Sequence, residues 1–255
     1  MPTPFTHLET AQRLLDDPYL TSATRDLLNS ERSAFLLGSI AADARVESGA
    51  SRDTTHFYAY DQPITEHPWR IMVRQYPALR EADDAGKRAF LAGYVAHLSI
   101  DEYWTLNMVR PYFVKREWNT PSREFRFLML HIILSYMDAR DLRLLRPWQH
   151  DCLCAAQPDG WLPFMSDTIL IGWRDFIGRQ IGADGSSQTL ALFGYRIGRK
   201  PEELQAILDS PEQMQHGLWD NVPREDLARI ESEMYAFARE QMEIFLRDEV
   251  RGMSQ

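Results

Sequence analysis

Cysteine is scarce in this chain of 255 residues, which has only Cys152 and Cys154 in the segment DCLC. Two cysteines at this spacing form no disulfide framework and suit a zinc-ribbon half-site poorly. No apolar run approaches the roughly 20 residues that a membrane-spanning helix needs. The N-terminus also lacks the basic region and apolar core of a signal peptide. We therefore expect a cytoplasmic protein without a transmembrane segment.

Positive charge is in short supply as well. The chain has 28 lysines and arginines against 37 aspartates and glutamates, so its formal net charge is -9. Such a chain has no general electrostatic attraction to a phosphate backbone, and no nucleic-acid partner is expected. It also lacks a G-x-S-x-G elbow, a P-loop and a G-x-G-x-x-G loop. These absences argue against a serine hydrolase and against the common nucleotide-binding folds.

Helical periodicity is present along almost the whole chain. The segment THLETAQRLL begins with the spacing of a capping box, and the last helical segment repeats apolar residues at Leu227, Ile230 and Met234. No alternating strand pattern of any length accompanies them. The sequence therefore predicts a single all-α domain over residues 1–255, with a metal-site half at about 1–145 and a C-terminal helical part at about 146–255. The amphipathic last helix leaves a homo-oligomer open.

The segment FLAGYVAHLSIDEYW places two polar residues inside an apolar helix. His97 and Asp101 are four residues apart and so share one face. A hydrogen-bonded core pair is one interpretation, because it answers the cost of burying both groups. The other is a metal site, since imidazole and carboxylate suit zinc or a similar divalent ion. The pair by itself favours the core interpretation.

The order of further residues changes that balance. His7 lies in the first turn of a predicted helix, where the dipole favours the neutral, metal-binding imidazole. Asp43 ends GSIAAD, His56 lies in THF, and His97 and Asp101 follow in GYVAHLSID. This ordered set resembles the zinc-dependent phospholipase C family, which is related to the single-strand-specific zinc nucleases. The resemblance implies an all-α fold and a clustered zinc site.

By this resemblance, one ion is held by a set of four residues, and Asp101 also bridges to a second ion held by His7. The set is Asp43, His56, His97 and Asp101. The chain departs from the family at Asn107, where a further histidine ligand is expected. Ser135 likewise stands four residues after His131, at a position where the family has a carboxylate. Asp138 returns to the face of His131, so these two are alternative ligands, but one or two Zn²⁺ ions are favoured over three.

The resemblance also implies an activity. Zinc ions polarise a phosphoryl oxygen and lower the pKa of a bound water toward about 7. We therefore expect a hydrolase of phosphoric esters, with Asp43 and Asp101 as catalytic metal-holding residues. Zinc is the expected cofactor, although another divalent metal is an alternative. The expected substrate is a small phosphoester or a phospholipid head group.

Four further residues are candidates for substrate binding. Arg45 and Arg52 flank the polar loop before His56 and can hold a phosphate in bidentate geometry, although pairing with nearby carboxylates explains them equally well. Tyr94 and Trp104 are candidates for a pocket wall. A non-catalytic metal-binding or scaffolding protein of the same fold is the main alternative function. An unrelated all-α ligand-binding protein is a third.

Overall fold

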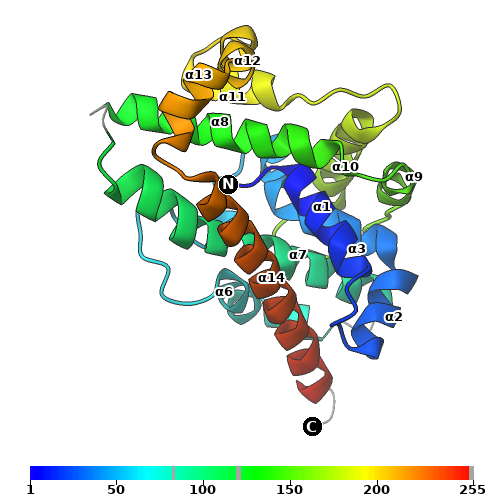
Figure 1. Cartoon of the computed structure of the whole chain (residues 1–255). Coiled ribbons are helices and arrows are strands. Elements are labelled where there is room, and N and C mark those ends of the chain that lie inside the picture. The colour runs from blue at the N-terminus through cyan, green and yellow to red at the C-terminus, as the bar shows by residue number, and fades with distance from the viewer. Residues whose placement is uncertain (82–83, 119–121, 253–255) are drawn as a thin grey trace.

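The computed structural model describes residues 1–81, 84–118 and 122–252, and it is built from helices (Figure 1). No β-strand occurs among these residues, which confirms the predicted all-α class. In the described ranges, no helix is both long enough and apolar enough to cross a membrane. The prediction of one domain in two parts is not tested by these observations and stays a prediction.

The chain up to residue 104 forms a series of short helices followed by one long helix. They are α1 (Pro4–Leu15), α2 (Ser22–Ser30), α3 (Arg32–Ala41), η1 (Ala42–Ala44), α4 (Arg45–Ser48), α5 (Asp53–His56), α6 (Pro68–Gln75), η2 (Pro77–Arg80) and α7 (Ala85–Trp104). The 20-residue α7 contains the segment FLAGYVAHLSIDEYW.

The second part begins where α7 passes directly into another helix. Its elements are η3 (Thr105–Lys115), α8 (Arg123–Leu142), α9 (Trp148–Cys154), α10 (Asp167–Ile181), α11 (Thr189–Ile197), α12 (Pro201–Leu208), α13 (Pro211–Met214), η4 (Gln215–Trp219) and α14 (Arg224–Gly252). In Figure 1, α8 runs across the upper part of the molecule, above α1 and α14. The helices α11, α12 and α13 lie above α8 in this view.

The buried α7 lies at the centre of the fold and packs most extensively against α3 and α14. Two glycines permit the close approach of α3. A Cβ atom on Gly38 would overlap the backbone of Phe90, and one on Gly93 would overlap the backbone of Phe35. Because neither glycine carries a side chain, the two backbones can touch at this crossing. The contact places the end of α3 beside His97.

The helix that follows α7 has the wider turns of a π-helix. Pro111 lies inside η3 and has no backbone N–H to donate. The carbonyl of Pro111 accepts from the Arg116 N–H, five residues later, at 3.0 Å. π-helical segments often occur at functional sites, and η3 contributes a wall to the cavity described below.

Candidate metal centre

Four elements bring the five principal predicted ligands together. His7 comes from α1, Asp43 from η1 and His56 from α5, while His97 and Asp101 come from α7. The ligand atoms of His7, His97 and Asp101 lie within 4.8 Å of one another, and so do those of Asp43, His56 and His97. Residues separated by up to 94 positions in the sequence therefore form one cluster.

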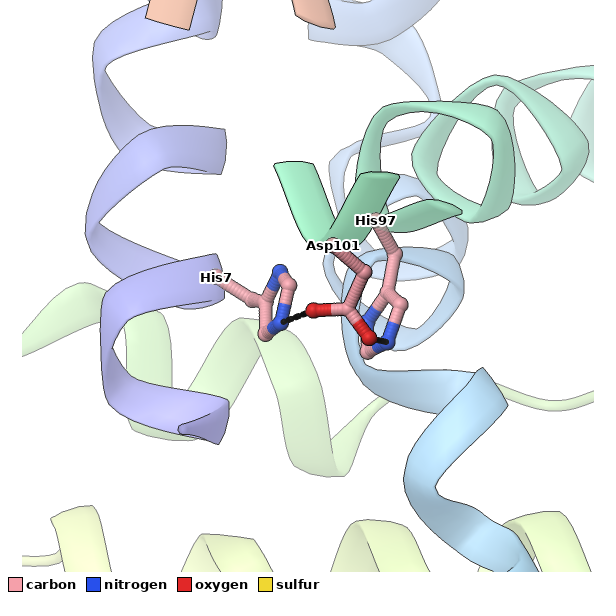
Figure 2. A group of neighbouring side chains, drawn as sticks. All are labelled: His7, His97 and Asp101. Carbon is pink, nitrogen blue, oxygen red and sulfur yellow. Dashed lines mark ion pairs between the residues drawn. The ribbon is translucent and has the colours of Figure 1, made fainter. Parts of the chain in front are cut away.

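Asp101 is the centre of this cluster. Its Oδ1 lies 3.5 Å from His7 Nε2, and its Oδ2 lies 3.3 Å from His56 Nε2 and 3.8 Å from His97 Nε2. Figure 2 shows the carboxylate between the imidazoles of α1 and α7. The side chains of all four residues are fully buried. A carboxylate that faces imidazoles with both oxygens has the placement that a bridging ligand requires.

The hydrogen bonds of His97 assign its tautomer. Its Nδ1 lies 2.8 Å from the carbonyl oxygen of Ser39, which can only accept, so Nδ1 carries the proton. Burial, and the neighbouring His7, lower the pKa of His97 to about 3. The ring is therefore neutral at pH 7, and its Nε2 presents a lone pair toward Asp101. Such an orienting bond is typical of metal-binding histidines.

His56 is oriented by its own turn. The hydroxyl of Thr55 lies 2.9 Å from His56 Nδ1 and 3.4 Å from the Arg52 carbonyl, to which it donates. His56 Nε2 lies 3.4 Å from Asp43 Oδ1 and 3.4 Å from His97 Nε2. Phe57 ends α5 in the left-handed conformation, with φ of 60°. A bulky residue adopts this conformation at a cost of about 1–3 kcal/mol, and here it turns the chain immediately after His56.

His7 completes the set from the first turn of α1, as predicted. Its ring stacks on that of His97, with centroids 3.8 Å apart and an interplanar angle of 10°. Neither ring nitrogen has a hydrogen-bond partner among the described residues, and Asp101 Oδ1 also lacks one. Buried polar atoms that have no hydrogen-bond partner are costly in a dry interior. A divalent cation between them removes this cost, so the donor set fits zinc.

Both carboxylates of the cluster are held in the charged form. Burial raises the pKa of Asp101, but the Arg52 guanidinium and the surrounding imidazoles hold it well below its usual range. Burial also raises the pKa of Asp43, but His56 and His97 hold it far below its usual range. Arg52 Nη2 lies 2.6 Å from Asp101 Oδ2 and 2.9 Å from the Tyr58 hydroxyl. Carboxylates that stay ionised are available as metal ligands over the whole neutral range.

A cavity of about 630 Å³ adjoins the cluster. Asp43, whose side chain is 17% exposed, lines it together with Arg45 and Arg52. Tyr60 also lines the cavity, and its ring lies under the Arg52 guanidinium at 4.7 Å. Both arginines that were predicted to bind substrate therefore face the same space as a predicted ligand. The volume falls in the range of about 300–1,000 Å³ that is usual for small-molecule sites.

The two aromatic candidates for substrate binding lie elsewhere. Tyr94 and Trp104 are completely buried, and neither is among the residues that line the cavity. The Tyr94 hydroxyl donates to the Thr55 carbonyl at 2.8 Å, so this side chain supports the turn that carries His56. Aromatic residues at helical spacing are most often core residues, and these two positions follow that rule. The prediction that these two residues form a pocket wall is therefore wrong, because both lie in the interior.

The alternative ligands His131 and Asp138 lie outside the cluster. Neither belongs to a group of three potential ligands in the described part of the chain. His131 Nδ1 donates to the Phe127 carbonyl at 2.8 Å, and Asp138 accepts from the Ser187 hydroxyl at 3.1 Å. Asn107, at the position where the resemblance predicts a further ligand, donates to the Tyr103 carbonyl. The arrangement therefore brings together the five principal candidates and leaves the third-ion candidates in separate contacts.

Three residues that matter to the geometry were not among the sequence candidates. Thr55 orients His56, and Tyr58 hydrogen-bonds Arg52. Their adjacency to His56 in DTTHFY was the available signal. Ser39 acts through its backbone carbonyl. A carbonyl is present at every residue, so no side-chain pattern could have identified this contact.

Comparison with known proteins gives one match. A family model described as zinc dependent phospholipase C matches residues 6–104. This range contains all five clustered side chains and ends with α7. No curated protein and no solved structure gives a significant match. The resemblance predicted from the order of His7, Asp43, His56, His97 and Asp101 is thereby confirmed.

Proposed function

From the similarity of residues 6–104 to the zinc-dependent phospholipase C family, we propose that this protein is a metal-dependent hydrolase of phosphoric esters. One observation carries the proposal. Three buried imidazoles and two ionised carboxylates face one another at 3.3–3.8 Å, with their cavity side lined by two arginines. Zinc is the proposed cofactor, held by His7, Asp43, His56, His97 and Asp101.

Different residues would make different contributions to such a reaction. When bound, zinc supplies a Lewis acid that polarises a phosphoryl oxygen and lowers the pKa of a water. Arg45 and Arg52 supply positive charge on the cavity wall and can hold the remaining phosphoryl oxygens. The Ser39 carbonyl keeps the Nε2 atom of His97 unprotonated, and the Thr55 hydroxyl orients the His56 ring through its Nδ1. The arrangement requires no serine or cysteine nucleophile.

A non-catalytic metal-binding or scaffolding protein is the second candidate function. It is favoured by Arg52, whose guanidinium already neutralises Asp101 at 2.6 Å, and by the hydrogen-bonded amide of Asn107. Both proposals expect a bound ion, but only the first expects turnover. A small phosphoester or phospholipid head group as substrate, a cytoplasmic location and a homo-oligomer stay predictions.

The test combines metal analysis with an activity assay. Purified protein is analysed by inductively coupled plasma mass spectrometry and assayed with bis(4-nitrophenyl) phosphate after zinc loading. We expect one or two zinc ions per chain and hydrolysis that a chelator abolishes. The His97→Ala variant is expected to lose at least tenfold in zinc affinity and most of its activity.

The matched control is His216→Ala. His216 has a side chain that is 71% exposed, and it pairs with Asp220 on the surface. This variant is expected to keep both metal and activity. Retention of metal and activity by His97→Ala would refute the proposal. Bound zinc without turnover of any phosphoester would leave the non-catalytic alternative.

A further inference from the structure

The cavity extends from the metal-binding residues into an apolar chamber. Phe113 of η3, Leu130 and Leu134 of α8, Ile177 of α10 and Phe193 of α11 line this part. All five residues lie beyond position 104, outside the range that matches the family. Because none of them is needed to hold the metal ligands, the chamber is a separate feature that the later helices add to the site.

The same cavity gathers exposed apolar side chains. Seven large hydrophobic residues in the described ranges are exposed, and four of them line this cavity. These four are Val46, Tyr60, Val114 and Phe127, which are 38%, 54%, 61% and 53% exposed. Contiguous exposed apolar surface is costly in water and usually marks a binding site for an apolar group. The apolar wall thus continues from the chamber to the solvent-facing edge of the cavity.

The charge of the cavity is opposite to that of the whole protein. Among the described residues, its lining contains Arg45, Arg52 and three further arginines, Arg110, Arg123 and Arg196, but only two carboxylates, Asp43 and Asp61. The chain as a whole carries a formal net charge of -9. A concentration of guanidinium groups in an acidic protein favours an anionic ligand at this place. The cavity therefore combines recognition of an anion with recognition of an apolar group.

We infer that the substrate is a single-chain amphiphilic phosphoester, whose phosphate lies at Arg45 and Arg52 and whose hydrocarbon chain lies along the chamber of Phe113, Leu134 and Phe193. The inference rests on the proposed hydrolase function and specifies its substrate class. Because the chamber receives the hydrocarbon chain of the substrate, we expect esters dispersed below their critical micelle concentrations to be hydrolysed.

A series of 4-nitrophenyl alkyl phosphates tests this inference. Esters with methyl, butyl, octyl and dodecyl groups are assayed with the zinc-loaded protein below their critical micelle concentrations. Each methylene that enters the chamber is expected to raise kcat/KM by up to about fourfold, the effect of burying one CH₂ group. The increase stops once the chamber is filled. A kcat/KM that is independent of chain length overturns the inference and leaves the hydrolase function intact.

Two variants test where the hydrocarbon chain of the substrate lies. Phe127→Glu places a carboxylate on the exposed part of the wall and is expected to lower kcat/KM at least tenfold more for the octyl ester than for the methyl ester. Leu144→Glu is the matched control, because Leu144 is 51% exposed and does not line the cavity. Leu134→Phe fills part of the chamber and is expected to shift the best chain to a shorter length. Equal effects of the two glutamate variants overturn the inference.

A binding measurement separates this inference from the proposed function. Octylphosphonate and methylphosphonate are titrated into the protein by isothermal titration calorimetry. We expect octylphosphonate to bind more tightly than methylphosphonate, and Phe127→Glu but not Leu144→Glu to weaken its binding. This result supports a binding site for the hydrocarbon chain even if no ester is hydrolysed. Equal affinity for the two phosphonates, or no binding of either, overturns it.

Discussion

At the scale of single residues, the centre depends on which nitrogen of each histidine carries a proton. His97 donates from Nδ1 to the Ser39 carbonyl, and the Thr55 hydroxyl lies 2.9 Å from His56 Nδ1. The Nε2 atom of His97 therefore presents a lone pair toward Asp101, and the Thr55 contact fixes the orientation of the His56 ring. The Ser39 contact comes from the backbone, but the Thr55 contact comes from a side chain that can be removed without changing the ligands.

Thr55→Val is expected to weaken zinc binding by about 10–100-fold, the usual effect of removing the partner that orients a metal-binding histidine. Valine has nearly the same shape, so the buried turn stays filled. The measurement is a competition titration with a coloured chelator. Thr54→Val is the control, because the Thr54 hydroxyl is exposed and donates to the Ser51 carbonyl and not to His56. Equal affinities of the two variants would contradict the role of Thr55.

Asp138 gives a prediction about pH. Its side chain is 2% exposed, and burial raises its pKa from 3.8 to about 6. Because the folded-state pKa is the higher one, the folded state favours the protonated form. The contribution of Asp138 to the free energy of unfolding is fully present below about pH 4 and is lost as the pH rises to about 6. At pH 7, Asp138→Asn is expected to increase the free energy of unfolding by up to about 3 kcal/mol, at about 1.4 kcal/mol per pKa unit.

The measurement for Asp138 is urea denaturation at pH 4.5 and pH 7.5. The gain of Asp138→Asn over the native chain should be larger at pH 7.5. Asp184→Asn, at an exposed position in the loop before α11, serves as the control and should change neither value by more than about 0.5 kcal/mol. A gain that is the same at both pH values would show that Asp138 does not titrate in this way.

At the scale of elements, the crossing of α3 and α7 positions the cluster. Gly38 and Gly93 let the two backbones touch, and this contact brings the Ser39 carbonyl within 2.8 Å of His97 Nδ1. The other elements depend on the same crossing, because α1 packs against both α3 and α7. A change at the crossing should therefore affect stability and metal binding together.

Gly93→Ala is expected to destabilise the fold by about 1–3 kcal/mol through overpacking and to weaken zinc binding. Its Cβ would overlap the backbone of Phe35 and Ser39. Gly172→Ala on α10 is the control, because the nearest atom to its Cβ, on Glu47, is 4.0 Å away. This substitution should be neutral or stabilising by up to about 1 kcal/mol. Thermal denaturation and the chelator titration check both effects, and similar results for the two variants would contradict the close crossing.

At the scale of the whole molecule, the cluster joins elements that are distant in the chain. The five side chains come from α1, η1, α5 and α7, so an ion bound among them ties four segments of the native state together. The unfolded chain does not assemble this set. Zinc should therefore stabilise the folded state by mass action.

Zinc at a hundredfold excess over its dissociation constant is expected to add about 2.7 kcal/mol, and this corresponds to roughly 5–10 °C in Tm for a chain of this size. The measurement is calorimetry of the native chain with zinc and with a chelator. His97→Ala should show little or no shift. An equal shift in the variant would place the stabilising ion elsewhere.

The sequence by itself was enough to predict the all-α class, from helical periodicity. It was also enough to predict the five clustered residues, from their order along the chain. Local geometry explains part of this success, because four-residue spacing puts His97 and Asp101 on one helical face. It could not predict that Tyr94 and Trp104 turn into the core, since both faces of α7 are covered and a buried aromatic residue has the same spacing as a pocket wall. Only the tertiary structure decided the Ser39 contact and the apolar chamber. Both depend on the packing of helices that are distant in the chain, and a backbone carbonyl or a shared cavity wall has no signature in any one segment.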